Sequence, residues 1–205
     1  MHPNPVFRGT PRDSNIAFAR ARGFGTLAIN AEGGPLLAHI PFLINEDASA
    51  LDLHLVRSNP ICRLTPVDAV LSVTGPDAYV SPDWYEADDQ VPTWNYISVH
   101  LRGTLESLPH EAMRNMLERQ SAAYESQLGG KTPWTMDKMS EGVADRMMRM
   151  ILPFRMKVTA IDGTWKLNQN KDDAARMKAA DHMTSSLGSE QETLARLMKS
   201  PPLEG

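Results

Sequence analysis

Four consecutive residues have the types needed to bind a phosphate group. Arg57, Ser58, Asn59 and Pro60 follow an apolar segment with the pattern of a strand. Proline is favoured at the first position of a helix, and serine or asparagine just before it. A helix start attracts anions, and the guanidinium of Arg57 can add paired hydrogen bonds. The pattern predicts a short helix from Pro60 with a phosphate at its start; the alternative is a plain turn with a solvated arginine.

A second group of residues suits a flat heterocycle. Trp94, Asn95 and Tyr96 end the string VPTWNY. The two aromatic side chains offer stacking surface with a polar edge, and the amide both donates and accepts hydrogen bonds, as an isoalloxazine ring requires. The alternative is an aromatic plug at the end of a barrel, and the residue types alone favour that alternative.

A third polar group follows an apolar strand near the C-terminus. Residues 165–170 read WKLNQN, which places Lys166 and Gln169 among other amides. The lysine can donate to a phosphate or to a ring carbonyl. The alternative is a solvated lead-in to a helix that begins near Lys171.

Other classes of site lack the pattern they require. His39, His54 and His100 lie in predicted strands, but no pair has the spacing of metal ligands, so no metal site is expected. Cys62 lies in an apolar stretch and is expected to pack as a small hydrophobe. The sequence contains no dinucleotide-binding glycine loop, no Walker loop and no nucleophile elbow, and no residue is assigned a catalytic role.

The first half of the chain has the pattern of β-strands. In residues 50–57, leucines alternate with Asp52, His54 and Val56, which predicts a half-buried strand. Strands are predicted at 23–30, 37–45, 50–57, 69–74 and 93–108, with a bulge or bend at Gly103. Residues 75–92, rich in proline and acidic side chains, are predicted as a long functional loop that carries a strand-like segment at 78–80.

The second half of the chain is mixed. Apolar residues at helical spacing predict helices over 109–126 and 140–151. The pattern then predicts a strand over 154–161, a turn at Asp162-Gly163, and a polar helical tail over 172–200 that is divided at Gly188. The fold class is therefore mainly β with helices, a small barrel with helical additions and a C-terminal helical tail.

Length and composition set further limits. A chain of 205 residues with 41% hydrophobic and 22% charged residues predicts one globular domain, assigned to 1–170, with the tail 171–205 packed on it. The N-terminus lacks a signal-peptide pattern, no segment reaches the roughly 18 apolar residues of a membrane helix, and the single cysteine fits a reducing compartment. These features predict a cytoplasmic protein without membrane contact.

Five strings in order resemble one family. They are similar to strings of the PaiB-type FMN-binding negative transcriptional regulators. In chain order they are HIPFL (39–43), His54 with Asn59-Pro60, YVSPDWY (79–85), VPTWNY (91–96) and WKLNQN (165–170). The resemblance covers roughly the whole chain. Three departures are Ile40 in place of leucine, Asn168 in place of serine, and Pro153 in place of glycine, and none removes an expected cofactor contact.

The resemblance implies a fold, a cofactor and a partner. It implies the flavin-binding split β-barrel, which pyridoxamine phosphate oxidase shares, and a homodimer with FMN in the crevice between two subunits. The cofactor-binding residues that it implies, together with the local patterns above, are Ala38, His39, Ile40, Pro41, Phe42, Val56, Arg57, Ser58, Asn59, Trp94, Asn95, Tyr96, Lys166 and Gln169.

Two functions remain open at this point. The first is a flavin-binding regulator or sensor, and the second is a flavoenzyme such as a flavin reductase or oxidase. The net charge of −4 and the mixed charges of the tail argue against direct DNA binding. Fold does not decide between regulator and enzyme, because one fold hosts many functions.

Overall fold

The computed structural model describes residues 2–202, which form two compact units. The terminal unit comprises residues 2–22, 72–100 and 161–202, and the central unit comprises 23–71 and 101–160. The predicted separation of a domain over 1–170 from a tail over 171–205 is a different division and stays a prediction. Residues 203–205 of that tail lie outside the described residues.

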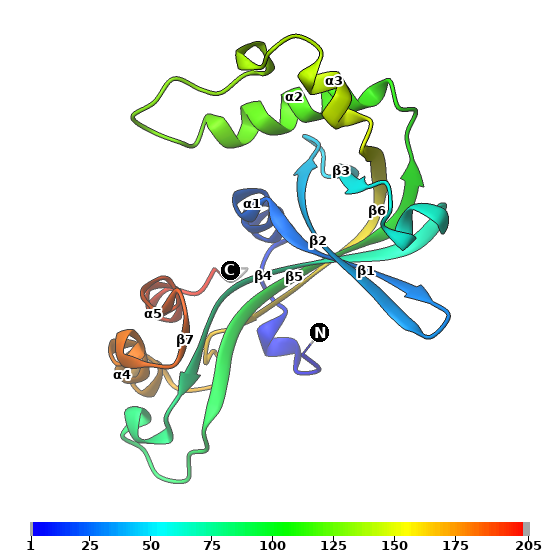
Figure 1. The fold of residues 1–205 in the computed structure, drawn as a ribbon. Helices are drawn as coiled ribbons and strands as arrows, with labels where there is room; N and C mark the ends of the chain where they lie inside the picture. The colour runs from blue at the N-terminus through cyan, green and yellow to red at the C-terminus, as the bar shows by residue number, and fades with distance from the viewer. Residues whose placement is uncertain (1, 203–205) are drawn as a thin grey trace. The chain divides into compact units, whose positions relative to one another are not determined.

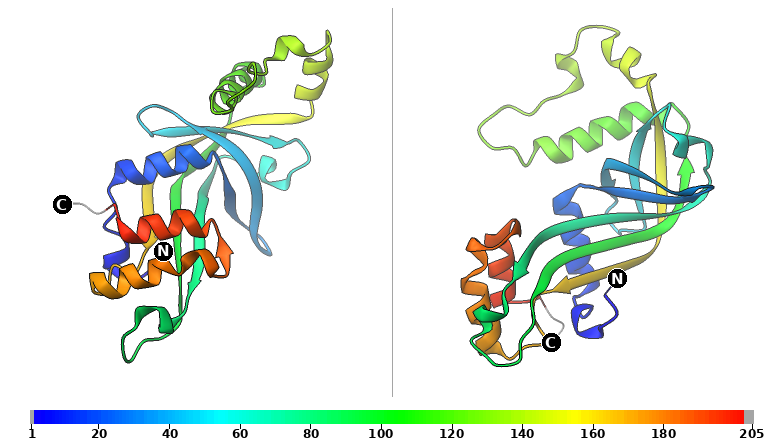
Figure 2. Two further views of the ribbon diagram at one scale, coloured as in Figure 1. Left: turned by 90° about the vertical axis from the view of Figure 1, so that its left-hand side faces the viewer. Right: turned by 60° about the horizontal axis from the view of Figure 1, so that its bottom comes forward.

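Seven strands form one sheet, and six of them close into a ring (Figure 1). The hydrogen-bonded order is β1-β2-β3-β6-β5-β4-β7, and an additional pairing of β1 with β4 joins the ends of the six-strand run. The strands are β1 (Phe24–Ala31), β2 (Gly34–Ile44), β3 (Ala50–Val56), β4 (Val67–Val80), β5 (Thr93–Ser107), β6 (Ile151–Lys166) and β7 (Gly188–Ser189). The predicted barrel is therefore confirmed. Figure 2 shows β4, β5 and β6 as long neighbouring strands, and each contributes residues to both units.

Alternation along the strands separates a buried inner face from an accessible outer face. On β1, Leu27 and Ile29 are buried, whereas Thr26 and Ala28, which alternate with them, are partly exposed. The antiparallel register of β3 and β6 sets Leu53 opposite Phe154, and both side chains are fully buried. The apolar face therefore fills the barrel, and the outer face is left for helices, ligands or a partner.

Residues 2–202 also form five α-helices and several short 3-10 helices. The α-helices are α1 (Arg12–Arg22), α2 (Ala112–Glu125), α3 (Val143–Met148), α4 (Asp173–Asp181) and α5 (Gln191–Lys199). The 3-10 helices are η1 (Pro5–Phe7), η2 (Pro60–Arg63), η3 (Pro82–Tyr85), η4 (Met136–Lys138) and η5 (Met183–Ser185). The helices predicted over 109–126 and 140–151 correspond to α2 and α3, and α3 is shorter because β6 begins at Ile151. Helix α1 was not predicted from the sequence.

Two loop predictions were wrong. Strand β4 continues to Val80, which confirms the strand-like segment predicted at 78–80, but the loop predicted at 75–92 begins only after that residue. Strand β6 runs through the predicted turn at Asp162-Gly163. The glycine serves close packing instead of a turn, because a Cβ at Gly163 would lie 2.0 Å from Oδ1 of Asn15 on α1. That same oxygen accepts a hydrogen bond from the indole of Trp165 at 2.8 Å.

The C-terminal residues form the helical layer of the terminal unit. Helices α4 and α5 lie side by side (Figure 2) and bury Ala179, Leu194 and Met198 against Tyr85 and neighbouring apolar residues. The predicted break at Gly188 is confirmed, because this glycine has a φ of +134° and begins β7.

One buried carboxylate fastens α2 to the barrel of the central unit. The side chain of Asp52 on β3 is 5% exposed and accepts hydrogen bonds from Arg119 on α2 at 2.6 Å and from Arg155 on β6 at 2.7 Å. Burial by itself raises the pKa of Asp52, but the hydrogen bonds and charges of Arg155 and Arg119 outweigh burial and hold this pKa below its ordinary value. The folded state therefore favours the ionised carboxylate.

We expect Asp52→Asn to lower the free energy of unfolding at neutral pH by about 1–3 kcal/mol, because the charge-assisted hydrogen bonds from two arginines weaken. The folded pKa of Asp52 lies below its unfolded value of about 3.9, so its contribution is present above that pH and is lost as the pH falls through the folded pKa. Denaturant titrations at neutral and acidic pH measure this: the gap between wild type and variant should close toward low pH.

The matched control for this variant is Glu106→Gln. Glu106 forms an exposed ion pair with Lys157 at 2.8 Å in the same unit, and such pairs contribute about 0–1 kcal/mol. If Asp52→Asn costs no more than the control, the carboxylate does not fasten α2.

Candidate functional site

The predicted phosphate-binding turn has a defined local structure. A 3-10 helix begins at Pro60, which confirms the predicted helix start. The side chain of Asn59 accepts a hydrogen bond from the backbone N–H of Ile61 at 3.0 Å, and the N–H of Asn59 donates to the carbonyl of Val56 at 2.8 Å. Asn59 thus caps the helix and already uses one of the N–H groups that an anion would need.

Arg57 presents a positioned guanidinium beside this turn. Its backbone N–H donates to the carbonyl of Met150 at 2.9 Å, and its Nε donates to the carbonyl of Arg149 at 2.9 Å. Among residues 2–202, no partner contacts its two terminal nitrogens. Arg57 and Ser58 are both exposed. The arrangement leaves the paired donors of the guanidinium available to an anion.

The candidates on β2 divide by the face they occupy. Ala38, Ile40 and Phe42 are buried inside the barrel, so their side chains are closed to a ligand. His39 points outward and shares a hydrogen bond of 3.0 Å between its Nδ1 and Oγ1 of Thr26 on β1. The outer face of β2 therefore offers a polar group at His39 alone among these candidates.

The candidates on β5 also lie on opposite faces. Trp94 is 47% exposed and packs edge-on near Tyr79, with 6.2 Å between ring centroids. Asn95, between Trp94 and Tyr96, is fully buried, and its amide N–H donates to the sulfur of Met198 at 3.4 Å. The pleat of the strand therefore turns the amide away from the two aromatic side chains.

Lys166 and Gln169 are engaged in local structure of the terminal unit. The ammonium of Lys166 donates to the hydroxyl of Thr93 and to the carbonyl of Trp94, the latter at 2.8 Å. Burial lowers the pKa of Lys166. The amide of Gln169 bonds to the carbonyl of Trp165 at 2.5 Å and to the backbone N–H of Leu167 at 2.8 Å. The Lys166 contacts fasten the end of β6 to the start of β5, whereas those of Gln169 order the segment that follows β6.

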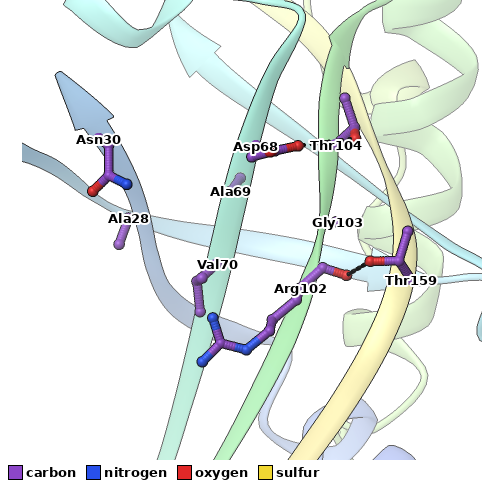
Figure 3. A pocket seen from close by; sticks show the side chains of 9 residues that line it. All are labelled: Ala28, Asn30, Asp68, Ala69, Val70, Arg102, Gly103, Thr104 and Thr159. Atoms are coloured by element: carbon purple, nitrogen blue, oxygen red, sulfur yellow. Dashed lines mark hydrogen bonds between the residues drawn. The ribbon is translucent and has the colours of Figure 1, made fainter.

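A polar groove that sequence reasoning missed lies on the outer face of the central unit (Figure 3). It encloses about 410 Å³ and is lined by Ala28, Asn30, Asp68, Ala69, Val70, Arg102, Gly103, Thr104 and Thr159. Two hydrogen bonds order its wall: Thr104 donates to Asp68 at 3.3 Å, and Thr159 donates to the carbonyl of Arg102 at 3.2 Å. Four strands build it, so the sequence signal was limited to polar residues alternating with apolar ones.

Gly103 keeps this groove flat. A Cβ at Gly103 would lie 1.8 Å from the carbonyl oxygen of Lys157 on β6, so any larger residue would force the two strands apart. The close approach to β6 explains why a glycine stands at this position of β5, and the bulge or bend predicted here stays a prediction.

Other classes of site are not represented among the described residues. No cluster of three or more His, Cys, Asp or Glu in residues 2–202 could hold a metal ion. No helix in this range is long and apolar enough to span a membrane.

Comparison with known proteins decides the family. Residues 1–160 match the family model described as "Putative FMN-binding domain". The chain belongs to this FMN-binding family. It is also 27% identical over 203 residues to "Protease synthase and sporulation protein PAI 2" of Bacillus subtilis (strain 168), with 97% of each chain covered. The resemblance to PaiB-type proteins is confirmed, and FMN is the cofactor.

Solved structures support the fold. A FAD- and heme-binding protein from Mycobacterium smegmatis aligns with a TM-score of 0.56 at 18% identity, covering 78% of this chain and 73% of the other. The flavocytochrome Anf3 from Azotobacter vinelandii aligns with a TM-score of 0.59 at 12% identity, covering 80% and 72%. The predicted flavin-binding split barrel is thus confirmed.

We expect Lys166→Ala to lower the melting temperature while changing FMN and riboflavin affinity by the same factor, because the ammonium holds two strands together. Thermal unfolding and titration of both flavins measure this. Lys178→Ala, which breaks an exposed ion pair with Glu86 in the same unit, is the matched control and should leave the melting temperature nearly unchanged. A loss confined to FMN would instead assign Lys166 to the phosphate.

Proposed function

We propose that the protein is a flavin-dependent regulator of the PaiB type that holds FMN by its phosphate at Arg57 and works as a homodimer. The observation that carries the regulatory role is the relative PAI 2, whose similarity spans 97% of both chains and whose name is "Protease synthase and sporulation protein". The residues around Arg57 carry the phosphate assignment.

The donors on the outer face of the central unit fit FMN. A phosphate dianion needs charge-assisted donors, and Arg57 offers its terminal N–H groups with Ser58 adjacent. Asn59 orients this turn by capping η2, so it serves as a positioning residue. When bound, FMN supplies reversible uptake of electrons; the residues named here bind and orient it.

The polar groove in Figure 3 supports a position for the flavin ring in the same unit. Its lining includes the small residues Ala28, Ala69 and Gly103, which suit the flat face of a ring. Its lining also includes Asn30 and Thr104, whose amide and hydroxyl suit the polar edge of a ring. His39 lies on the same outer face, one strand away from Ala28.

Exposed apolar side chains on this face support a homodimer. Phe24 on β1 is 57% exposed and Leu37 on β2 is 60% exposed. Both belong to the outward-facing residues that alternate with the barrel core, as do Thr26 and His39. A second copy packed on this face would bury the two apolar side chains and add a second wall beside the flavin.

Direct DNA binding through the C-terminal helices is not supported. Arg176 pairs with Asp173, and Lys199 pairs with Asp181. A groove-binding helix needs cations that are available to phosphates, whereas these are neutralised within the layer. Regulation through a flavin-dependent protein surface agrees better with this charge pattern.

An NADH-oxidation assay on the FMN-loaded protein separates the regulator from a flavoenzyme, because steady turnover would favour the enzyme.

We expect Arg57→Ala to weaken FMN binding by roughly ten- to a hundredfold, because hydrogen bonds between charged groups contribute about 1.5–3 kcal/mol. Riboflavin affinity should barely change, since riboflavin has no phosphate. Fluorescence titration with both flavins measures the two affinities. Arg63→Ala, at the exposed end of η2, is the matched control. Equal losses for both flavins would show that Arg57 supports the ring or the fold and not the phosphate.

We expect light scattering to give the mass of a homodimer at micromolar concentration, and Leu37→Glu to shift the population toward monomer. The introduced charge would be buried without a partner in the interface. Leu187→Glu, at a 71% exposed position of the terminal unit, is the control and should leave the mass unchanged. A monomer that retains FMN would contradict the proposal.

A further inference from the structure

A polar cavity of about 420 Å³ lies in the terminal unit. It is lined by residues of η1, of the turn that joins η1 to α1, of the first part of α1, and of β6 near Gly163. The polar groove of Figure 3 and the turn at Arg57 belong to the central unit, so neither is part of this cavity. Its volume is within the range of small-molecule sites.

Two arginines of the lining bring positive charge to the cavity. Arg8 and Arg12 are both lining residues, and both are exposed. Among residues 2–202, neither guanidinium forms an ion pair or a side-chain hydrogen bond. Arg22, at the other end of α1, differs from them because it pairs with Glu190 at 2.6 Å. The paired donors of two guanidinium groups are therefore available to an anion in the cavity.

The surroundings of the two arginines do not cancel their charge. Helix α1 begins at Arg12, and the partial positive charge of a helix start adds to that of the guanidinium groups. Asp162 is the acidic residue of the lining, and it is already engaged in an interaction of its own. Asp13 is exposed and is not a lining residue. The lining thus carries more positive than negative charge.

Thr10 supplies a buried hydroxyl to the same cavity. The residue is 7% exposed and belongs to the lining. In the part of the chain that the structure describes, its Oγ1 forms no hydrogen bond, yet it is not one of the partnerless polar atoms that are sealed from solvent. Because the rest of the residue is enclosed, this oxygen is reached through the cavity. An occupant that accepts a hydrogen bond from it would recover the free energy that an unpaired hydroxyl costs.

Asn15 fixes the wall of the cavity without using these groups. Its side chain is buried, and its Nδ2 donates to the carbonyls of Thr10 and Pro11, both at 3.2 Å. Its Oδ1 accepts a hydrogen bond from the indole of Trp165 on β6. The turn before α1 is therefore held against β6 before any ligand arrives, which lowers the cost of ordering the site on binding.

We propose that this cavity binds the phosphate group of a small molecule, free or esterified, with Arg8 and Arg12 as its cations and the hydroxyl of Thr10 as a further donor. A phosphate dianion matches two guanidinium groups, whereas a carboxylate carries only one charge. The volume leaves room for the organic part of an ester beside Pro5 and Ile161. The proposal does not rest on FMN binding at Arg57.

Calorimetric titration of the FMN-loaded full chain with glycerol 3-phosphate, at constant ionic strength, tests the proposal. Loading with FMN fills the flavin site first. We expect one further phosphate ester per chain and at least about tenfold weaker binding of acetate. Inorganic phosphate is the second probe: tighter binding of the ester supports an esterified occupant, and equal binding supports free phosphate. Absence of binding of both probes, or equal affinity for acetate, would overturn the proposal.

The double variant Arg8→Gln, Arg12→Gln locates the anion. It should weaken binding of glycerol 3-phosphate at least about tenfold, because charge-assisted hydrogen bonds are lost. The matched control is Lys178→Gln, Arg196→Gln, which removes the same charge from exposed positions of α4 and α5 in the same unit. The control should change the affinity by less than about twofold. Equal losses in the two double variants would reduce the effect to net charge and refute the site.

Substitutions of Thr10 test the buried hydroxyl. Thr10→Val keeps the shape of the side chain and removes its donor, so it should weaken binding of glycerol 3-phosphate several-fold. Thr10→Ser keeps the hydroxyl and should restore most of the affinity, with circular dichroism as the check on the fold. If the valine and serine variants bind equally well, the anion does not contact this residue and the assignment is wrong.

Gly9 offers a change of charge within the lining. A Cβ at Gly9 would meet no atom within 4 Å, so a side chain is accommodated there. Gly9→Glu should weaken binding of glycerol 3-phosphate several-fold relative to Gly9→Gln, which has nearly the same size and no charge. Identical affinities of these two variants would place the phosphate elsewhere.

Flavin titrations separate this site from the proposed flavin site. The double arginine variant should keep the FMN affinity of the wild type, and Arg57→Ala should keep its affinity for glycerol 3-phosphate. If the double variant loses affinity for FMN but not for riboflavin, the phosphate of FMN itself occupies the cavity and the proposal fails. An unchanged FMN affinity in Arg57→Ala would instead count against the flavin site alone.

Discussion

Pairing of β1 with β4 is the constraint on which the rest of the structure depends. It joins the ends of six strands, so that the backbone groups of these strands find partners within the ring. In the closed ring, the pleat of each strand directs successive side chains alternately into the barrel and out of it. Leu27, Phe42 and Phe154 fill the interior, whereas His39 and Trp94 are among the side chains that the pleat turns outward. The outer face is consequently divided between covering helices and open, ligand-accessible surface.

The covering helices depend on polar contacts as well as apolar ones. Asp52 lies on the outer face of β3, where a carboxylate would normally remain in water, and two arginines permit its burial beneath α2. His54, two residues further along the same face, has its pKa lowered by burial, while Gln120 of α2 opposes the shift. Because α2 is held at these positions, the segment that follows it can remain irregular and still define an apolar cavity.

The candidate flavin site uses the open part of this face. Its cation, Arg57, is positioned by two backbone carbonyls of the residues just before β6, so its orientation depends on the pairing of β3 with β6. Such a site gains specificity from rigid backbone and not from a long loop. The family match over residues 1–160 includes every strand of the ring except the end of β6.

The sequence by itself determined the local features of this protein. The leucines of residues 50–57 predicted a strand with one buried face, Asn59-Pro60 predicted a helix start, and the ordered strings predicted the family and its cofactor. These features depend on neighbours within a few residues, where spacing and backbone preference are sufficient. The tertiary structure decided what depends on distant partners: Gly163 packs against Asn15 instead of turning, Lys166 binds residues 72 and 73 positions away, and four strands assemble the polar groove. No periodicity in one segment records which other segment will lie against it, because that choice is made by strand pairing and packing across the whole chain.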